Sequence, residues 1–339
     1  MLFPIPPSTV NHFRKAFASS GTKDDPVDAE LILEILLKHR HKIWAWKPDD
    51  VQTRLLTRLV EARRKIVNMR TQQVQTLMAA LKESFPQALE LMGEDLGAML
   101  ACDFLLKWPT LQQLKKAQTQ TVRKFYYAHN CRRGDLIEKR LAFIAQSVAL
   151  TQDEAVLESS RMFIETLAQQ LRSLIPSIKK YDLKIREVFS QHPDQEIFSS
   201  LPGAGEVMAP RLLTAFGSDR SRFPMALNMA QYSGIGPVTK RSGKSSTVYR
   251  RLARPKFILQ SFHEFAGFSI HFSRWAKAVY DSLRSTGKGH HASIRALAFK
   301  WTRVIFRCWQ DRKPYDENHY LNVLKKQGSP FANQPLESL

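Results

Sequence analysis

Residues 53–72 read TRLLTRLVEARRKIVNMRTQ, and their apolar side chains recur every three or four positions. The same period extends over residues 51–85, and a second stretch with this period covers about residues 153–189. Such spacing predicts two long amphipathic helices, the second of which Pro176 should bend or interrupt. A loop-rich insertion with shorter helices separates them. We therefore predict an antiparallel coiled-coil arm in a mostly α protein.

The segment that precedes the first long helix carries two closely spaced aspartates. Residues 24–40, DDPVDAELILEILLKHR, predict a helix, and KIWAW at 42–46 predicts a short strand. Asp25 as N-cap, Pro26 in the first turn and Asp28 three residues after the cap would suit a helix start. The same spacing places both carboxylates on one face, where they could hold Mg²⁺ if further acids joined them.

The charge of the chain is strongly basic and unevenly distributed. Its 339 residues carry a net charge of +20, and +14 of this lies between Arg220 and Arg303. A localised excess of this size predicts a polyanionic partner, and nucleic acid is the partner that suits it best. Aromatic residues interleaved with these cations would serve base stacking or core packing. They are Tyr249, Phe257, Phe262, Phe265, Phe268, Phe272, Trp275 and Trp301.

The three cysteines, Cys102, Cys131 and Cys308, are far apart and form no C-x-x-C pair. This spacing indicates neither a disulfide framework nor a zinc ribbon and favours a reducing compartment. No apolar run reaches the length of about 18 residues that spans a bilayer, and the first ten residues lack the pattern of a signal peptide. We therefore expect a cytoplasmic protein with no membrane partner.

The second half of the chain contains a glycine-rich turn. After a predicted linker, QHPDQEIF at 191–198, residues 201–217 read LPGAGEVMAPRLLTAFG and resemble a helix-hairpin-helix motif. Gly203 and Gly205 would let backbone N–H groups approach a DNA phosphate at a helix N-terminus. The alternative is an ordinary turn between packed helices. The remainder is predicted to be mostly helical, with His290 and His291 at a helix start.

Residues 235–251, IGPVTKRSGKSSTVYRR, combine five Lys or Arg and three Ser with no carboxylate. Gly243, Lys244 and Ser245 match the end of a phosphate-binding P-loop. That motif also requires a glycine at the position of Val238, and no Val/Ile-rich strand leads into it. Nucleotide hydrolysis is therefore disfavoured.

Five segments taken in order resemble the IS110 family of insertion-sequence transposases, which are RNA-guided DNA recombinases. The resemblance covers nearly the whole chain, and the ordered combination is more specific than any one segment. The segments are GTKDDPVDAELILEILL (21–37), residues 53–72, LPGAGEVMAPRLLTAFGSDRSRF (201–223), AQYSGIGPVTKRSGKSS (230–246) and GKGHHASIRALAFKWTRVIFRCWQDRKPYD (287–316).

The resemblance implies a domain order. Residues 1–50 would be the C-terminal part, a remnant, of an α/β RuvC-like (RNase H-like) DEDD domain. Residues 51–192 would form the coiled-coil arm that builds dimers or tetramers. Residues 198–328 would form the helical transposase domain, and residues 329–339 a flexible tail.

It also implies roles for single residues. Asp25 and Asp28 match the last two acids of the DEDD set, which bind Mg²⁺, and Ser242 matches the nucleophilic serine. The expected activity is cutting and rejoining of DNA through a 5′-phosphoserine, with the DNA sequence selected by base pairing to a structured guide RNA. The predicted nucleic-acid-binding residues are Gly203, Gly205, Lys240, Arg241, Lys244, Arg250 and Arg251.

In the family an Asp and a Glu lie upstream of the D-x-x-D-A segment, whereas only 24 residues precede Asp25 here. The sequence thus predicts an incomplete metal site, either because the true start lies upstream or because this is a partial copy. The alternative function is a catalytically incompetent nucleic-acid-binding remnant. A helix-hairpin-helix repair nuclease is disfavoured, because Glu206 and Asp219 are almost the only acids near that motif.

Overall fold

The computed structural model of the protein describes residues 2–17, 24–43, 45–243, 245–249, 251–252 and 254–332. These residues are mostly helical, which confirms the mostly α part of the predicted fold class. They divide into two units, Met1–Arg54 and Leu55–Leu339. Of the predicted tail, residues 333–339 lie outside the described residues, and a short 3-10 helix precedes them at Pro330–Ala332.

The first unit contains α1 (Pro7–Phe17), α2 (Asp25–His39) and a 3-10 turn, η1 (Arg40–Lys42). Its small core consists of Val10, Leu31 and Ile35, which are all buried. Leu31 and Ile35 lie one turn apart on α2, so a single apolar stripe packs against α1.

The strand predicted at residues 42–46 is wrong for the described part of this segment. Lys42 ends η1, and Trp46 makes one isolated antiparallel bridge, in which its N–H donates to the Leu2 carbonyl at 2.7 Å. One bridge does not build a ladder, because a strand needs successive pairs along its length. The RuvC-like sheet that the resemblance implies therefore stays a prediction.

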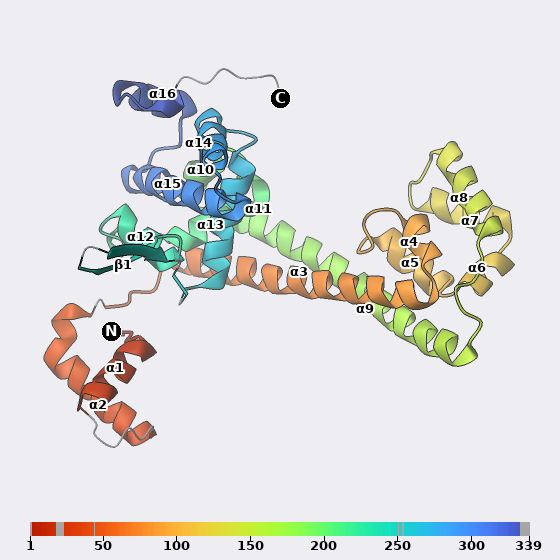
Figure 1. Cartoon of the computed structure of the whole chain (residues 1–339), viewed down its shortest axis with the longest axis horizontal. Helices are drawn as coiled ribbons and strands as arrows, with labels where there is room; N and C mark the ends of the chain where they lie inside the picture. The colour runs from red at the N-terminus through yellow and green to blue at the C-terminus, as the bar shows by residue number, and fades with distance from the viewer. Residues whose placement is uncertain are drawn as a thin grey trace. The chain divides into compact units, whose positions relative to one another are not determined.

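The second unit consists of helices and one hairpin (Figure 1). Its longest elements are α3 (Val51–Ser84), which begins at the boundary between the units, and α9 (Glu154–Ser190). Their bounds confirm both long helices predicted from the sequence. Between them lie α4 (Gln87–Met92), α5 (Met99–Lys107), α6 (Leu111–Lys116), α7 (Thr119–Ala128) and α8 (Gly134–Gln146). After them come α10 (Gln195–Ser199), α11 (Gly205–Phe216), η2 (Arg220–Arg222), α12 (Ala226–Ser233), β1 (Val238–Ser242), β2 (Ser245–Tyr249), α13 (Lys256–Ser269), α14 (Arg274–Ser285), α15 (His290–Asp311) and α16 (Glu317–Lys326).

The interruption predicted at Pro176 does not occur, because α9 continues through this residue. A proline inside a helix removes one backbone hydrogen bond and crowds the preceding turn. Pro176 is exposed, so water can reach the carbonyl that loses its partner. The length of apolar stripe on either side then outweighs this local cost.

Two hydrophobic cores share α3 and α9. The first core joins the start of α3 and the end of α9 to α10–α16, and the second joins the end of α3 and the middle of α9 to α4–α8. The ends of the two long helices are therefore held in place by different sets of neighbours.

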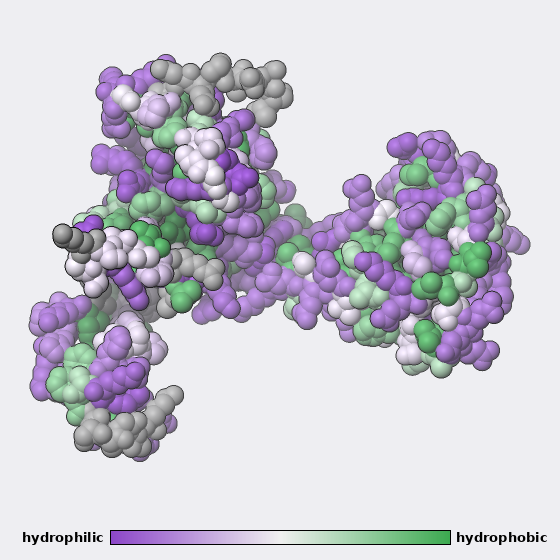
Figure 2. Space-filling view, in the orientation of Figure 1, coloured by the Kyte–Doolittle hydropathy of each residue, from purple (hydrophilic) through white to green (hydrophobic). Residues whose placement is uncertain are grey.

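Between the two cores, α3 and α9 run antiparallel. Arg63 forms an ion pair with Asp182, and Gln73 Nε2 donates to Gln170 Oε1 at 2.9 Å. No residue is buried between Val60 and Leu77 of α3, a fully described stretch, and hydrophilic residues predominate on its visible face (Figure 2). A two-stranded coiled coil buries a continuous apolar seam. The coiled-coil prediction is therefore not confirmed by the single chain.

The linker predicted at residues 191–198 is wrong, since this segment is packed into the first core. His192, Asp194, Ile197 and Phe198 are all at least 95% buried. Asp194 makes a two-pronged ion pair with Arg220, with oxygen–nitrogen distances of 2.5 and 2.6 Å. Proline and polar residues suggested an exposed connection, but a buried acid can be stable when its charge is paired.

Candidate nucleic-acid interface

A two-stranded antiparallel hairpin, β1–β2, carries the predicted nucleophile. Ser242 pairs with Ser245 next to the turn, and Val238 pairs with Tyr249 at the other end. Gly243 has φ +55°, a left-handed conformation that glycine adopts without a steric cost, and no atom lies within 4 Å of where its Cβ would be. The sequence analysis missed this hairpin. Its signal was a Gly-containing turn between two segments rich in Thr, Val and Tyr.

The hairpin also settles the P-loop question. In a P-loop the Gly-Lys-Ser end opens a helix, whereas here Ser245 begins β2. The backbone around Gly243 therefore does not form a phosphate cradle at a helix N-terminus, in agreement with the sequence argument.

Ser242 is the last residue of β1, and its side chain is exposed. Among the described residues no hydrogen bond involves its hydroxyl, so none of them acts as a base that orients it. A serine in this setting is free to meet a ligand from solvent. It also depends on surrounding charge for activation, because a serine hydroxyl is a weak nucleophile at its ordinary pKa.

Cations line the same hairpin. Lys240 lies over the ring of Tyr249, with its Nζ 5.5 Å from the ring centroid, and the side chain of Arg241 is exposed. Arg251 lies just beyond β2 and is half-buried. The predicted contacts Lys244 and Arg250 lie outside the described residues.

Gly203 and Gly205 lie in the same turn, but the atoms around the two glycines differ. A Cβ on Gly203, at φ +75°, would lie 2.8 Å from Phe272 Cδ2 and 3.2 Å from the backbone of Phe268. Close packing therefore explains Gly203. Gly205, at φ +51°, begins α11 and has nothing within 4 Å of its missing Cβ. The helix-hairpin-helix interpretation stays a prediction. It depends on Gly205 in the turn and on α10, which has five residues, as the first helix of the motif.

The predicted cap at the start of α2 is wrong by one position. The N-cap is Asp24, which makes no side-chain capping bond, so Asp25 is the first helical residue. The backbone N–H of Asp28 donates to the Asp24 carbonyl at 3.0 Å, and its carboxylate pairs with Arg14. The Asp25 side chain is exposed.

These residues do not by themselves fit a Mg²⁺ site. Over the described ranges no three His, Cys, Asp or Glu side chains converge as metal ligands. The pairing of Asp28 with Arg14 further lowers the charge available to a cation. We therefore derive no chemical step through a metal ion, and Mg²⁺ at Asp25 and Asp28 stays a prediction that requires additional ligands.

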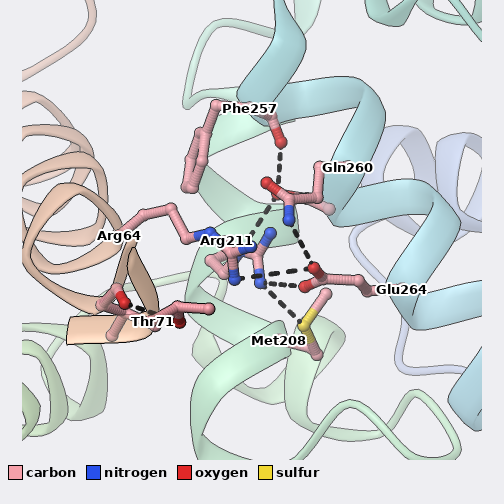
Figure 3. A network of polar contacts seen from close by, with 9 residues as sticks. Arg64, Thr71, Met208, Arg211, Phe257, Gln260 and Glu264 are labelled. Carbon is pink, nitrogen blue, oxygen red and sulfur yellow. Dashed lines mark hydrogen bonds and ion pairs between the residues drawn. The ribbon is translucent and has the colours of Figure 1, made fainter. Parts of the chain in front are cut away.

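In the second unit, one arginine is held inside the protein. Arg211 of α11 is 5% exposed and donates from Nη1 to Glu264 at 2.6 Å and from Nε to Ser261 at 3.1 Å (Figure 3). Glu264 also accepts from Gln260 at 2.7 Å and lies 3.6 Å from Arg64 of α3. Burial lowers the pKa of the Arg211 guanidinium, against the raising effect of Glu264. The network thus joins α3, α11 and α13 and is structural.

The interleaved aromatic residues divide between the two roles left open by the sequence. Phe262, Phe265, Trp275 and Trp301 are at most 1% exposed and pack in the first core. The exposed members are Tyr249, Phe268 and Phe272, with exposed fractions of 51%, 49% and 67%. These three are exposed enough to stack on a base, whereas Phe257 is half-buried and lies under the Arg211 guanidinium. His290 and His291 do begin a helix, α15, as predicted.

Among the described helices, none combines the length and the apolar character that crossing a membrane requires.

Comparisons with known proteins give the same family over two separate parts of the chain. A model of IS110-type DEDD transposases matches residues 1–86, and a model described as Transposase IS116/IS110/IS902 family matches residues 195–281. The mini-circle protein of Streptomyces coelicolor named as a transposase for IS117 is 27% identical over 93% of this chain and 77% of its own length. The 42 kDa protein of insertion element IS900 from Mycobacterium paratuberculosis is 27% identical over 93% of this chain and 78% of its own. The 44.8 kDa protein of IS116 from Streptomyces clavuligerus is 24% identical over 91% and 76%.

Proposed function

The chain belongs to the IS110 family of insertion-sequence transposases and is a DNA transposase, and from this premise we propose that Ser242 is its nucleophile. The observation that supports this most is the place of Ser242, exposed at the turn end of a basic hairpin. The residues matched by the second family model include the whole hairpin.

The proposed reaction conserves the phosphodiester bond energy. Ser242 Oγ attacks a DNA phosphorus atom, the P–O3′ bond breaks, and the leaving strand keeps a 3′-hydroxyl. The Oγ proton passes to solvent, and the 3′ oxygen takes up a proton. In the second step a 3′-hydroxyl of a new strand attacks the 5′-phosphoserine and releases Ser242. No nucleotide cofactor is consumed.

Lys240 and Arg241 supply the positive charge on which the activation of Ser242 depends. Both are on β1 with Ser242, and neither forms an ion pair with a carboxylate among the described residues. Their charge is therefore free to offset the scissile phosphate and the additional negative charge of the transition state, the type of electrostatic stabilisation that usually contributes most to catalysis. Lys244 and Arg250 would add to this charge.

DNA is the partner of a transposase, and we propose a structured guide RNA as a second partner that selects the sequence by base pairing. The protein would then grip mainly backbone, which suits its charge. We also propose that α3 and α9 join copies of the chain into dimers or tetramers. Their half-buried apolar residues between the two cores, such as Ile66 and Ile178, would complete a seam there.

One observation favours the alternative of an inactive nucleic-acid-binding remnant: Asp28 is engaged by Arg14, and no third ligand joins the two aspartates in the part of the chain that is described. The two functions differ in one product. An active enzyme forms a covalent DNA adduct, and a remnant only binds.

The test uses DNA from the end of the insertion sequence, trapped with the full chain and analysed by denaturing gel and mass spectrometry. We expect an adduct at Ser242 that Ser242→Ala reduces by at least about 1,000-fold. Ser245→Ala is the matched control, because Ser245 pairs with Ser242 across the same turn and should leave the adduct in place. An adduct that survives Ser242→Ala contradicts the assignment, and no adduct in any variant supports the remnant.

A further inference from the structure

A cavity of about 300 Å³ lies beside the foot of the hairpin, at the end opposite Ser242. Arg251, which follows β2, lines it together with Arg254, Lys256 and Arg295. These cations come from the segment after the hairpin, from the start of α13 and from α15. Two parts of the chain, the segment that leads from the hairpin into α13 and the helix α15, therefore direct positive charge to one place.

The single carboxylate at this cavity does not neutralise it. Glu264 already accepts from Arg211 and Gln260, and Arg64 lies close to the same oxygen as Gln260. Arg211 and Arg64 are not among the residues that line the cavity. The charge of Glu264 is therefore neutralised by Arg211 and Arg64, which do not line the cavity. The positive charge of the four cations that do line the cavity remains unbalanced.

One of these cations is held in place before any ligand arrives. Arg254 Nη1 donates to the Leu252 carbonyl at 2.9 Å and to the Arg251 carbonyl. Its aliphatic part packs on Gly234, the C-cap of α12, where an added Cβ would lie 2.5 Å from Arg254 Cβ. A side chain that is already ordered loses less entropy on binding than the exposed cations of the hairpin.

The pKa of His263, on α13, is also affected by the excess of positive charge at this cavity. Burial first, and then the neighbouring charges of His291 and Arg295, lower the pKa of His263. Its ring lies 5.5 Å from that of His291. The group is thus an uncharged donor or acceptor at neutral pH, suited to a hydrogen bond with an anion whose charge the arginines balance.

We propose that this cavity binds one backbone phosphate of the DNA strand that crosses the hairpin, and thereby sets the position of the scissile phosphate at Ser242. The inference rests on the proposed function, since it takes the DNA to be cut at that serine.

The length of the hairpin fixes the spacing. Val238 and Ser242 are four residues apart along β1, or about 14 Å at the usual rise of a strand. One DNA strand advances about 3.4 Å per nucleotide along the duplex axis. The anchored phosphate is therefore expected about four nucleotides from the cut. Because the hairpin itself is exposed on both strands, a fixed point at its base would limit where its tip meets the DNA.

The first experiment measures binding alone, in Ser242→Ala protein, so that its outcome is independent of whether Ser242 is the nucleophile. A fluorescent 30-bp DNA duplex is titrated at several salt concentrations. We expect Arg254→Gln and Arg295→Gln each to weaken binding about tenfold and to lower the slope of log K against log salt by about 0.9. The control Arg307→Gln removes an equal charge from the exposed side of the same helix, α15, where Arg307 pairs with Asp311.

The second experiment locates the phosphate. Single methylphosphonate linkages, which are neutral, replace successive phosphates in the cleaved strand. A linkage at the anchored position should weaken binding of Ser242→Ala protein and have no further effect when Arg254→Gln is also present. Thermal unfolding of each variant shows whether it is folded.

Three outcomes would overturn the inference. Arg307→Gln could change the slope as much as Arg254→Gln, which would make net charge the cause. Alternatively, every methylphosphonate linkage could have the same effect on binding with and without Arg254→Gln. The loss could also be confined to a single-stranded RNA probe of equal length, which would make the cavity an RNA site. In each case the adduct test at Ser242 stands separately.

Discussion

Arginine occupies opposite surroundings in two neighbouring regions of this transposase. Arg241 projects from the β1–β2 hairpin into solvent without a carboxylate partner among the described residues. Arg211, on α11, is buried against Glu264, Ser261 and the ring of Phe257. The first is available to DNA and contributes little to the fold. The second stabilises the fold and is closed to DNA. Positive charge along the sequence is therefore a guide to function only where burial leaves it free.

The buried pair of Asp194 and Arg220 gives the largest effect on the core side of this comparison. Asp194→Ala should lower the free energy of unfolding by about 3–5 kcal/mol, because it leaves the Arg220 guanidinium, whose side chain is only 16% exposed, without its carboxylate partner. Urea unfolding followed by circular dichroism measures this. The control Asp311→Ala breaks the exposed pair with Arg307 and should cost less than about 1 kcal/mol. Equal losses of unfolding free energy in the two variants would contradict the argument that an ion pair contributes more to stability when it is buried.

Glu264→Gln tests the Arg211 network. We expect a loss of about 2 kcal/mol in the free energy of unfolding, because the charged hydrogen bond to a buried guanidinium is replaced by a neutral one. The matched control is Glu206→Gln, whose partner Arg186 is exposed. If both substitutions had the same small effect on urea unfolding, the network would not hold α11 to α13.

On the hairpin side, Arg241→Gln should leave the free energy of unfolding within about 0.5 kcal/mol of its original value. It should lower the salt slope of DNA binding by about 0.9. Arg241→Lys keeps the charge and should restore the slope. A large loss of stability, or a slope that stays unchanged, would remove the contrast with Arg211.

The smallest expected effect concerns His263. Its pKa is lower in the folded protein than the ordinary value of about 6.5. The unfolded chain therefore binds its proton at a higher pH, so stability from this group is complete above about pH 6.5 and decreases as the pH falls. His263→Gln should make the free energy of unfolding depend less on pH between about 7.5 and 5. The exposed His319 provides the control substitution, and a slope unaffected by His263→Gln would contradict the prediction.

Much of the helical part of the fold could be predicted from periodicity. Helices α3 and α9 begin and end within about two residues of the bounds expected from their apolar stripes, because these stripes are long. Short segments were less predictable. The start of α2 lies one residue earlier than expected, the described residues of 42–46 form no ladder, and half of the segment at 191–198 is buried. In each of these segments the local sequence preference for one structure was weak. The presence or absence of tertiary contacts therefore decided which structure formed.

The candidate site was predicted as a list of residues, and the tertiary structure gave them different surroundings. Ser242, Lys240 and Arg241 share one exposed strand, whereas Gly203 is explained by its packing against Phe272. The cavity with Arg254, Lys256 and Arg295 had no signal in the sequence, because its members come from elements separated by up to about forty residues. The domain boundaries at 50, 192 and 198 stay predictions.

The sequence by itself determined the family, the long helices and the excess of positive charge, since each depends on composition, order or a repeating pattern along the chain. Only the tertiary structure decided which cations remain free, which aromatic rings are buried and that Ser242 stands at the turn of a hairpin. Burial and ion pairing depend on residues brought together from distant positions, and no local pattern encodes them.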